Sequence, residues 1–411
     1  MSEIEERLAD LKDRGLYRRL RVISGPQGPR VVLDGRPVLL LCSNNYLGLA
    51  DHPGVREAAA EAAMRYGAGA GASRLVSGNM RIHRRLEEEL ADFKGSEACV
   101  LFGSGYLANA GMIPTLAREG DVVFSDALNH ASVVDGCRLA RAETFVYDHG
   151  DLEQLAWGLR QAEGRGSLIV TDGVFSMDGD VAPLEQIVEL ARRHDVRVMV
   201  DEAHGTGTMG PGGRGSVAAA GLEDEVDLVV GTLSKSLGSY GAFVCCDKTM
   251  AKYLVNSART LIFSTALPPP AVAAAMAALA LLRDQPRRVE KLQRNAQVLR
   301  EALAEKGLPV AQSGTHIVPL IVGDAGAAMA ATERALEQGV FAQAIRPPTV
   351  PAGTSRLRLS VMASHTKSEL KNAASTLAAA VPRVQRVPET APAAAAVSAE
   401  GRVFDQLVDA A

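Results

Sequence analysis

The stretch "VMVDEAHGTGTMG", residues 198–210, decides the fold class, because it joins a buried apolar strand to a glycine-rich loop. The letters "DEAH" (201–204) are those of a box that holds magnesium in one group of nucleic-acid helicases, whereas "GTGTMG" (205–210) fits the dinucleotide-binding pattern G-x-G-x-x-G. A third interpretation is that Asp201 and His204, at the end of a strand, bind a different cofactor. The remainder of the chain distinguishes these interpretations.

The composition argues against a nucleic-acid or membrane partner. The chain has 411 residues, a net charge of −4, 47% hydrophobic and 22% charged residues, which is typical of a globular protein with a large core. The N-terminal stretch "MSEIEERLADLKDRGLYRRLR" is charged and helical, without an apolar signal region. The five cysteines show no metal-ligand spacing. We therefore expect a cytoplasmic protein with reduced cysteines and no metal site.

Upstream and downstream of the opening stretch, short apolar runs alternate with helical patterns. The expected strands are "ACVLF", "DVVFSD", "SLIVTDG", "VRVMVDEAH", "VDLVVGT" and "GAFVCCD". Helices are expected between them, beginning near Gly105, near His130 and at Pro183. This rhythm predicts an α/β fold with a mainly parallel sheet covered on both faces.

The sequence predicts four segments. Residues 1–50 form an N-terminal helix and a hairpin that turns at Asp34-Gly35, and residues 51–285 form the large α/β domain. Residues 286–381 form a smaller α+β domain, and residues 382–411 are an Ala/Pro-rich tail, expected to be disordered. The tail ends in "VFDQLVDAA", whose apolar stripe leaves two interpretations open, a frayed end or a docking peptide.

Two of the three interpretations of the opening stretch lack a necessary partner. A helicase requires a Walker A loop, and the nearest candidate, "GTLSKS", has no glycine before Lys235. A dinucleotide site requires a helix directly after the glycines, but "GTGTMG" runs into Pro211 and "GGRGS", which is loop chemistry. The third interpretation remains.

It is strengthened by "VGTLSKSLGSYGAF", residues 230–243. Lys235 follows an apolar strand and lies among small residues, so a planar group can approach its amine closely. A partly desolvated lysine loses basicity and can form a Schiff base. Pyridoxal phosphate further requires an acid for its pyridinium nitrogen, a phosphate cradle and a group against its ring. Asp201 suits the role of the acid. The start of the helix at Gly105, with the hydroxyls of Thr232 and Ser234, suits the phosphate cradle, and His130 suits the group against the ring.

At this point the chain resembles the α-oxoamine synthases, which are fold-type I pyridoxal-phosphate transferases related to aspartate aminotransferase. The resemblance covers about residues 1–380 and rests on motifs that occur in order: "CSNNYLGLA", "GAGASRLVSG", "HRRLEEELADF", "LFGSGYLAN", "LNHAS", "GVFSMDGD", "VDEAHGTG", "GTLSKSLGSYG", "FSTALPP" and "IRPPTVPAGTSRLRLS". It implies a large domain with a mainly parallel seven-stranded sheet, a smaller α+β domain and a homodimer with active sites at the subunit interface.

The resemblance also implies roles for individual residues. Lys235, Asp201 and His130 are the catalytic residues: the Schiff-base lysine and base, the pyridinium partner and the ring-stacking histidine. The implied cofactor contacts are Gly105, Tyr106, His130, Ser176, Asp201, His204, Thr232 and Lys235, with Ser264 and Thr265 reaching the neighbouring subunit's phosphate. The implied substrate contacts are Asn44, His130 and Arg358 for the amino acid, and Arg21 and Thr349 for the acyl group. Arg18 and Arg19 remain alternatives to Arg21, and Arg346 is a weaker acyl candidate.

The implied activity is condensation of L-alanine with a pimeloyl thioester, carried by CoA or a carrier protein, with loss of CO2, in biotin biosynthesis. Three alternatives stay open: a sibling synthase that uses glycine or serine with another acyl-CoA, an aminotransferase of the same fold, and a non-catalytic cofactor-binding protein. Within "SRLRLS", strand alternation places Arg356 and Arg358 on one face, and a guanidinium can hold a carboxylate in a bidentate pair.

Overall fold

The computed structural model describes residues 2–310 and 313–382, which form three β-sheets and the helices around them. The predicted tail, including its alternative as a docking peptide, lies outside the described residues from residue 383 onward. None of the helices in the described ranges is long and apolar enough to cross a membrane.

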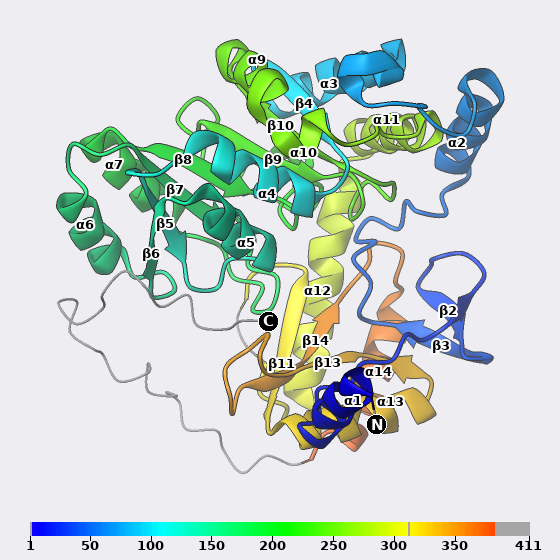
Figure 1. Ribbon diagram of the computed structural model, residues 1–411. Coiled ribbons are helices and arrows are strands. Elements are labelled where there is room, and N and C mark those ends of the chain that lie inside the picture. The colour runs from blue at the N-terminus through cyan, green and yellow to red at the C-terminus, as the bar shows by residue number, and fades with distance from the viewer. Residues whose placement is uncertain (1, 311–312, 383–411) are drawn as a thin grey trace.

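The largest sheet has seven strands in the order β4-β10-β9-β8-β7-β5-β6 (Figure 1). The strands are β4 (Ala98–Phe102), β5 (Val122–Asp126), β6 (Glu143–Tyr147), β7 (Ser167–Asp172), β8 (Arg197–Asp201), β9 (Leu228–Thr232) and β10 (Ala242–Cys246). Only β10 among them runs antiparallel to its neighbours. The predicted mainly parallel sheet is therefore confirmed. Six strands were expected from their apolar runs, whereas β6 was missed because "ETFVY" begins with two polar residues and is only partly buried at the sheet edge.

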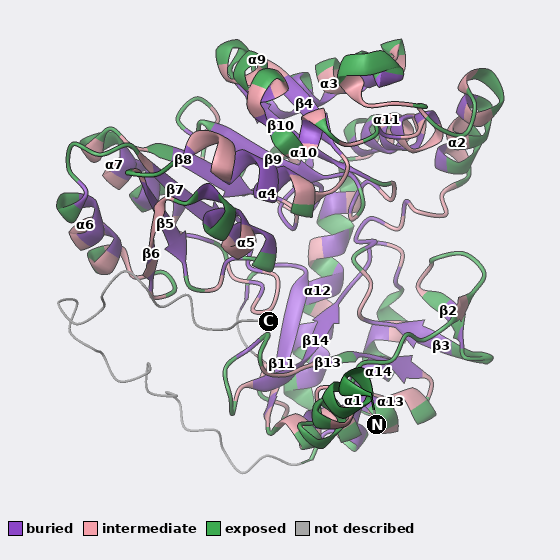
Figure 2. Cartoon of the chain, viewed as in Figure 1, coloured by how far each residue is buried: buried purple, intermediate pink, exposed green. Residues whose placement is uncertain are grey.

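Helices cover both faces of this sheet, and Figure 2 shows most of its strands as buried, with the edge strand β6 only partly so. One face packs against α4 (Gly105–Leu116), α5 (Ala131–Ala140), α9 (Lys248–Ser257) and α10 (Arg259–Ile262). The other packs against α3 (Arg81–Lys94), α6 (Leu152–Gln161), α7 (Leu184–His194) and α11 (Pro269–Asp284), and α11 also contacts α2 (Pro53–Tyr66). Cys245 and Cys246 belong to the cores on opposite faces, as the alternation of side chains along a strand requires.

A second, antiparallel sheet lies beyond the long helix α12 (Arg287–Glu305) and has the order β11-β14-β13. Its strands are β11 (Ile317–Gly323), β13 (Gln343–Ile345) and β14 (Ser355–Ser360), and its other helices are α13 (Ala325–Glu337) and α14 (Lys367–Ala380). The division into domains at residues 50, 285 and 381 remains a prediction.

The N-terminal segment joins this second half of the molecule. Helix α1 (Glu3–Asp13) buries none of its residues, and β1 (Ile23–Ser24), β2 (Arg30–Leu33) and β3 (Arg36–Leu40) follow it. The β2–β3 hairpin turns at Asp34 and Gly35, whose φ angles are 47° and 81°, as this residue pair favours. Strand β3 then pairs with β12 (Val340–Phe341), a contact that links residue 40 to residue 341 and that local patterns did not predict.

Candidate active site

The candidate site begins where the central strands of the large sheet end. Asp172, Asp201 and Thr232 are the last residues of the neighbouring strands β7, β8 and β9. Because these strands are parallel, their carboxyl ends meet at one edge of the sheet, where ligands of open α/β sheets bind. Helices α4 and α5 begin at loops that follow β4 and β5.

Asp201 is buried and held by amides. Its Oδ2 accepts a hydrogen bond of 2.6 Å from Asn109 Nδ2, and its Oδ1 accepts one of 2.8 Å from the backbone N of Ala203. Asn109 Nδ2 also donates to Ser132 Oγ, which lies 2.7 Å from His130 Nδ1. His130 caps α5 and its side chain remains exposed. One network therefore ties the carboxylate to the histidine that is expected to cover a cofactor ring.

Lys235 lies directly against His204. The two atoms Nζ of Lys235 and Nε2 of His204 are 2.8 Å apart. Burial lowers the pKa of Lys235 to about 8, and Asp201 and Asp172 oppose this shift. Burial and the charge of Lys235 hold the pKa of His204 well below its usual range. The amine is thus available as a nucleophile or base near neutral pH, beside a neutral imidazole.

The glycines of the opening stretch make room for these residues. A side chain on Gly205 would collide with Glu202 Oε2, while Glu202 Oε1 accepts from Ser216 Oγ and from the backbone of Val217 at the start of the short helix α8 (Ser216–Ala219). A Cβ on Gly207 would lie 2.5 Å from that of Ser236, the neighbour of Lys235. The motif therefore lets the lysine loop approach closely. After it come only the 3-10 turn η2 (Pro211–Gly213) and the four-residue α8.

Arg358, on β14, reaches across from the second sheet into the same site. It donates hydrogen bonds to the backbone O of Ser176, to Asn44 Oδ1 at 3.2 Å and to Ser360 Oγ at 3.0 Å. Arg356 lies on the same strand and pairs with Asp178. Both arginines are buried, so the alternative that they are surface charges is wrong. Tertiary contacts thus assemble Asn44, Ser176 and Arg358 from three distant segments.

A second opening faces the start of α4. Ser104 caps this helix by accepting from the backbone N of Leu107, and a Cβ built on Gly105 meets no other atom within 4 Å. Tyr106 is exposed and its hydroxyl donates to Asp135 on α5. Thr232 Oγ1 is 2.7 Å from Ser234 Oγ. The free space in front of a helix N-terminus suits a phosphate group.

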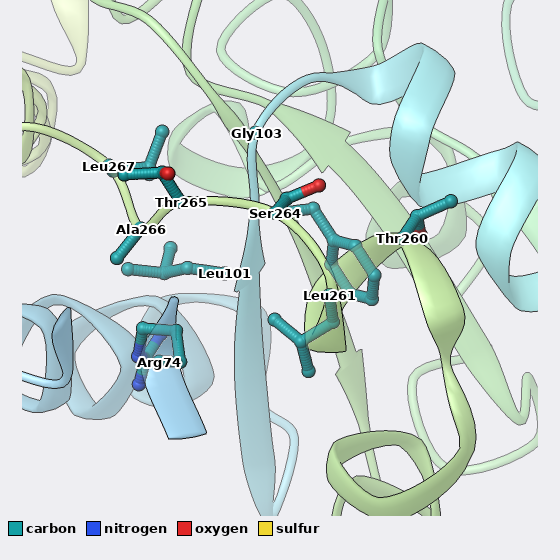
Figure 3. A pocket seen from close by; sticks show the side chains of 10 residues that line it. Arg74, Leu101, Gly103, Thr260, Leu261, Ser264, Thr265, Ala266 and Leu267 are labelled. Atoms are coloured by element: carbon teal, nitrogen blue, oxygen red, sulfur yellow. The ribbon is translucent and has the colours of Figure 1, made fainter. Parts of the chain in front are cut away.

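Ser264 and Thr265 lie on the chain next to this region. Figure 3 shows them beside Gly103 and Arg74, where they line a cavity of about 10 Å³. That volume is about the minimum for one water molecule. Arg74 is already engaged by Glu87 through two hydrogen bonds of 2.9 Å.

The predicted acyl contacts lie farther out, in a cavity of about 700 Å³. Arg21 and Thr349 both line it, together with the alternatives Arg18, Arg19 and Arg346. Arg21 pairs with Glu333 and lies 3.8 Å from Asp34 Oδ2, and its guanidinium covers the ring of Phe341. The structure therefore brings Arg21 and Thr349 to one cavity. It does not distinguish Arg21 from the alternatives Arg18, Arg19 and Arg346 as the acyl contact.

The arrangement fits pyridoxal phosphate. A lysine with a lowered pKa, a carboxylate fixed at a strand end and an open helix N-terminus are the groups that this cofactor needs. Partial desolvation of the His130 ring by the surrounding protein lowers its pKa; the charge of Asp201 opposes this shift and that of Lys235 adds to it.

The sequence matches the aminotransferase class I and II family over residues 36–377. The chain belongs to this family. A relative from Geobacter sulfurreducens, an 8-amino-7-oxononanoate synthase, is 54% identical over 374 residues, which cover 90% of this chain and 96% of the relative.

Solved structures of the family agree with the fold. A serine palmitoyltransferase from S. paucimobilis with a bound PLP–myriocin aldimine has a TM-score of 0.87 and 35% identity, covering 92% of this chain and 96% of that one. An 8-amino-7-oxononanoate synthase from Francisella tularensis has a TM-score of 0.73 and 27% identity, covering 83% and 97%. The prediction of a fold-type I transferase is confirmed.

Sequence reasoning did not assign roles to several residues that complete this aminotransferase-family site. Asn109 holds Asp201, and Tyr46 contacts His204 and Arg358. His316 packs edge-on against Tyr46, with ring centroids 4.0 Å apart. Asn109 and Tyr46 stand inside the motifs "LFGSGYLAN" and "CSNNYLGLA", which was the available signal, whereas nothing local marks His316.

Proposed function

We propose that this enzyme uses pyridoxal phosphate to condense L-alanine with a pimeloyl thioester, which releases CO2 and the free thiol and gives 8-amino-7-oxononanoate, a precursor of biotin. The single observation that carries the chemistry is the Lys235–His204 contact of 2.8 Å beside the buried carboxylate of Asp201. The 54% identity to a synthase of that name supports the choice of substrates.

Lys235, Asp201 and His130 carry the reaction in this proposal. When bound, pyridoxal phosphate supplies an aldehyde and an electron-withdrawing ring that stabilises negative charge at the amino acid's α-carbon. Nζ of Lys235, with its pKa lowered to about 8, removes the α-proton and later returns one. Asp201, fixed by Asn109, would hold a proton on the pyridine nitrogen of the bound cofactor, and His130 would pack against its ring.

The amino acid is oriented by its carboxylate. Arg358 and Asn44 are within 3.2 Å of each other and lie near Ser176, so a carboxylate bound there points its α-carbon towards Lys235. His204 contacts Lys235 and faces the cofactor's phenolic oxygen in this proposal. The acyl thioester enters the cavity lined by Arg21 and Thr349, where a guanidinium can meet the distal carboxylate of a pimeloyl chain.

The phosphate contacts belong to the same proposal. Gly105 and Tyr106 offer backbone at the start of α4, and Thr232 offers a hydroxyl. Ser264 and Thr265 serve the phosphate of a second subunit, in a homodimer. Exposed apolar side chains near these residues, at Leu75, Val76 and Phe263, support burial of this surface against another subunit. We place the enzyme in the cytoplasm.

One experiment tests the assignment. Alanine, glycine or serine is added to the holoenzyme, and the absorbance of the bound cofactor is recorded before and after pimeloyl, acetyl, succinyl and palmitoyl thioesters. We expect the largest response and a decarboxylated product with alanine and a pimeloyl thioester. A preference for glycine with acetyl-CoA would contradict the assignment, and keto-acid exchange without any thioester would favour an aminotransferase.

A further inference from the structure

Tyr46 connects two parts of the site: the pair His204 and Lys235, and the arginine Arg358. Its hydroxyl lies 2.7 Å from His204 Nδ1 and 2.9 Å from Asn44 Oδ1, and it accepts a hydrogen bond of 3.3 Å from Arg358 Nη2. His204 in turn contacts Lys235 through its other ring nitrogen. The hydroxyl is thus one residue away from the base and in direct contact with the arginine expected to bind the amino-acid carboxylate.

The ring of Tyr46 is held firmly in place. Its side chain is fully buried, and His316 packs edge-on against it. Its backbone N donates to Asn44 O at 2.8 Å, and its backbone O accepts from Ala363 N at 2.7 Å. Because the ring cannot move far, the position of the hydroxyl between His204 and Arg358 is fixed by the fold rather than by a flexible side chain.

A hydroxyl both donates and accepts, so it can match either neutral tautomer of His204. When Lys235 is an ammonium, it donates to Nε2, the ring proton lies on Nδ1 and points at the tyrosine oxygen, and the tyrosine O–H turns to Asn44. When Lys235 is a neutral amine, Nε2–H donates to it, Nδ1 accepts the tyrosine O–H, and Arg358 donates to the tyrosine oxygen. All partners keep hydrogen bonds in both states.

We propose that Tyr46 is a positioning residue that lets the tautomer of His204 follow the protonation of Lys235 and couples that change to Arg358. The proposal rests on the proposed function only for the roles of Lys235 and Arg358 in the reaction. Phenylalanine cannot perform this role, because it leaves Nδ1 of a buried imidazole without a partner in either state.

The test is Tyr46→Phe, which keeps the ring and removes only the hydroxyl. We expect kcat to fall roughly 10-fold. This is only part of the rate enhancement that a well-placed general base supplies, because Lys235 itself is still present. The KM for the amino acid should change less than about 3-fold, because Arg358 keeps Ser176, Asn44 and Ser360 as partners. The pH midpoint of the holoenzyme absorbance should shift by at least ~0.5 unit, since the neighbour of Lys235 has lost its adjustable partner.

A matched control is Tyr147→Phe, which removes a hydroxyl from another fully buried tyrosine, at the end of β6. It should leave kcat and the pH midpoint unchanged. A loss of similar size in both variants would show a general packing effect and overturn the proposal. So would Tyr46→Phe with wild-type kcat and wild-type pH dependence.

A measurement on the apoenzyme needs neither substrate nor a stable variant. Nitrogen-15 NMR of wild-type apoenzyme with labelled histidine reports the tautomer of His204 across the pH range. We expect the ring proton to move between Nδ1 and Nε2 with a midpoint near pH 8, the lowered pKa of Lys235. One fixed tautomer at all pH values would overturn the proposal. This outcome is independent of which thioester the enzyme uses, so it is distinguishable from failure of the proposed function.

Discussion

The two halves of the candidate site are built differently. Asp201 and His204 are each 6% exposed; Asp201 ends β8 and His204 lies three residues beyond it, and hydrogen bonds hold both side chains. The cavity around Arg21 and Thr349 is formed by surface segments, and several arginines line it. The comparison teaches that the core holds the residues proposed for the chemistry, whereas the residues proposed for acyl binding lie on a surface that can vary without disturbing the core.

The largest effect is expected at the centre of the buried half. Lys235→Ala removes the amine that binds the cofactor and moves the α-proton, so kcat should fall at least ~10³-fold. Steady-state synthesis is the measurement, with Lys252→Ala on the exposed side of α9 as the control. Retained synthesis in the Lys235 variant would remove this residue as the base.

A smaller loss of activity is expected from a change at Asp201. Asp201→Asn keeps the shape of the side chain but no longer holds a proton on the pyridine nitrogen, so α-proton loss should slow roughly 10²-fold. Exchange of the α-proton of alanine with deuterated solvent measures this step without a thioester. Thermal unfolding should stay close to that of the wild type. Unchanged exchange would contradict the role given to Asp201.

Replacing one arginine by alanine in each half of the site sharpens the comparison between the halves. Arg358→Ala should raise the KM for alanine about 10-fold or more, because a buried charge-assisted contact is lost. Arg21→Ala should raise the KM for the thioester only about 3-fold, because its cavity is solvated. Each variant should leave the KM of the other substrate nearly unchanged. If both arginines affect the same substrate, the two halves are not separate sites.

The smallest effect concerns the stability of the buried half. His149 bridges Asp126 at 3.0 Å and Asp180 at 2.7 Å, which ties the loop of His130 to the loop of Ser176. These carboxylates raise the pKa of His149 to about 10, against the opposing effect of burial. A raised pKa stabilises the fold fully below the unfolded value of about 6.5, and this contribution disappears as pH rises towards 10.

His149→Gln should therefore lower the free energy of unfolding by about 1–2 kcal/mol below pH 6.5, a figure that allows for partial solvent exposure of the pair. The difference from wild type should shrink towards pH 10, as urea unfolding across this range will measure. His194→Gln at the end of α7 is the control. A difference that stays constant with pH would mean that His149 does not carry the charge.

Most elements of the large domain could be predicted from the sequence, because each fully buried strand is a continuous apolar run. Strand β6 was missed because it begins with two polar residues and is only partly buried, so it has no long apolar run. The helix starts at Gly105 and at residue 184 follow Ser104 and Pro183, which are local signals. The pairing of β3 with β12 could not be predicted, because residues about 300 apart in the chain meet only when the core has formed.

By itself the sequence determined the cofactor chemistry: an apolar strand ending in Asp201, a lysine among small residues and ordered motifs are local patterns. It also placed the glycines of "GTGTMG" in a loop, although their reason, room for Glu202 and for Ser236, became visible only in three dimensions. Only the tertiary structure decided that Tyr46 links His204 to Arg358 and that His316 supports it. Such contacts depend on how segments distant in the chain pack together, and no spacing along the chain encodes that packing.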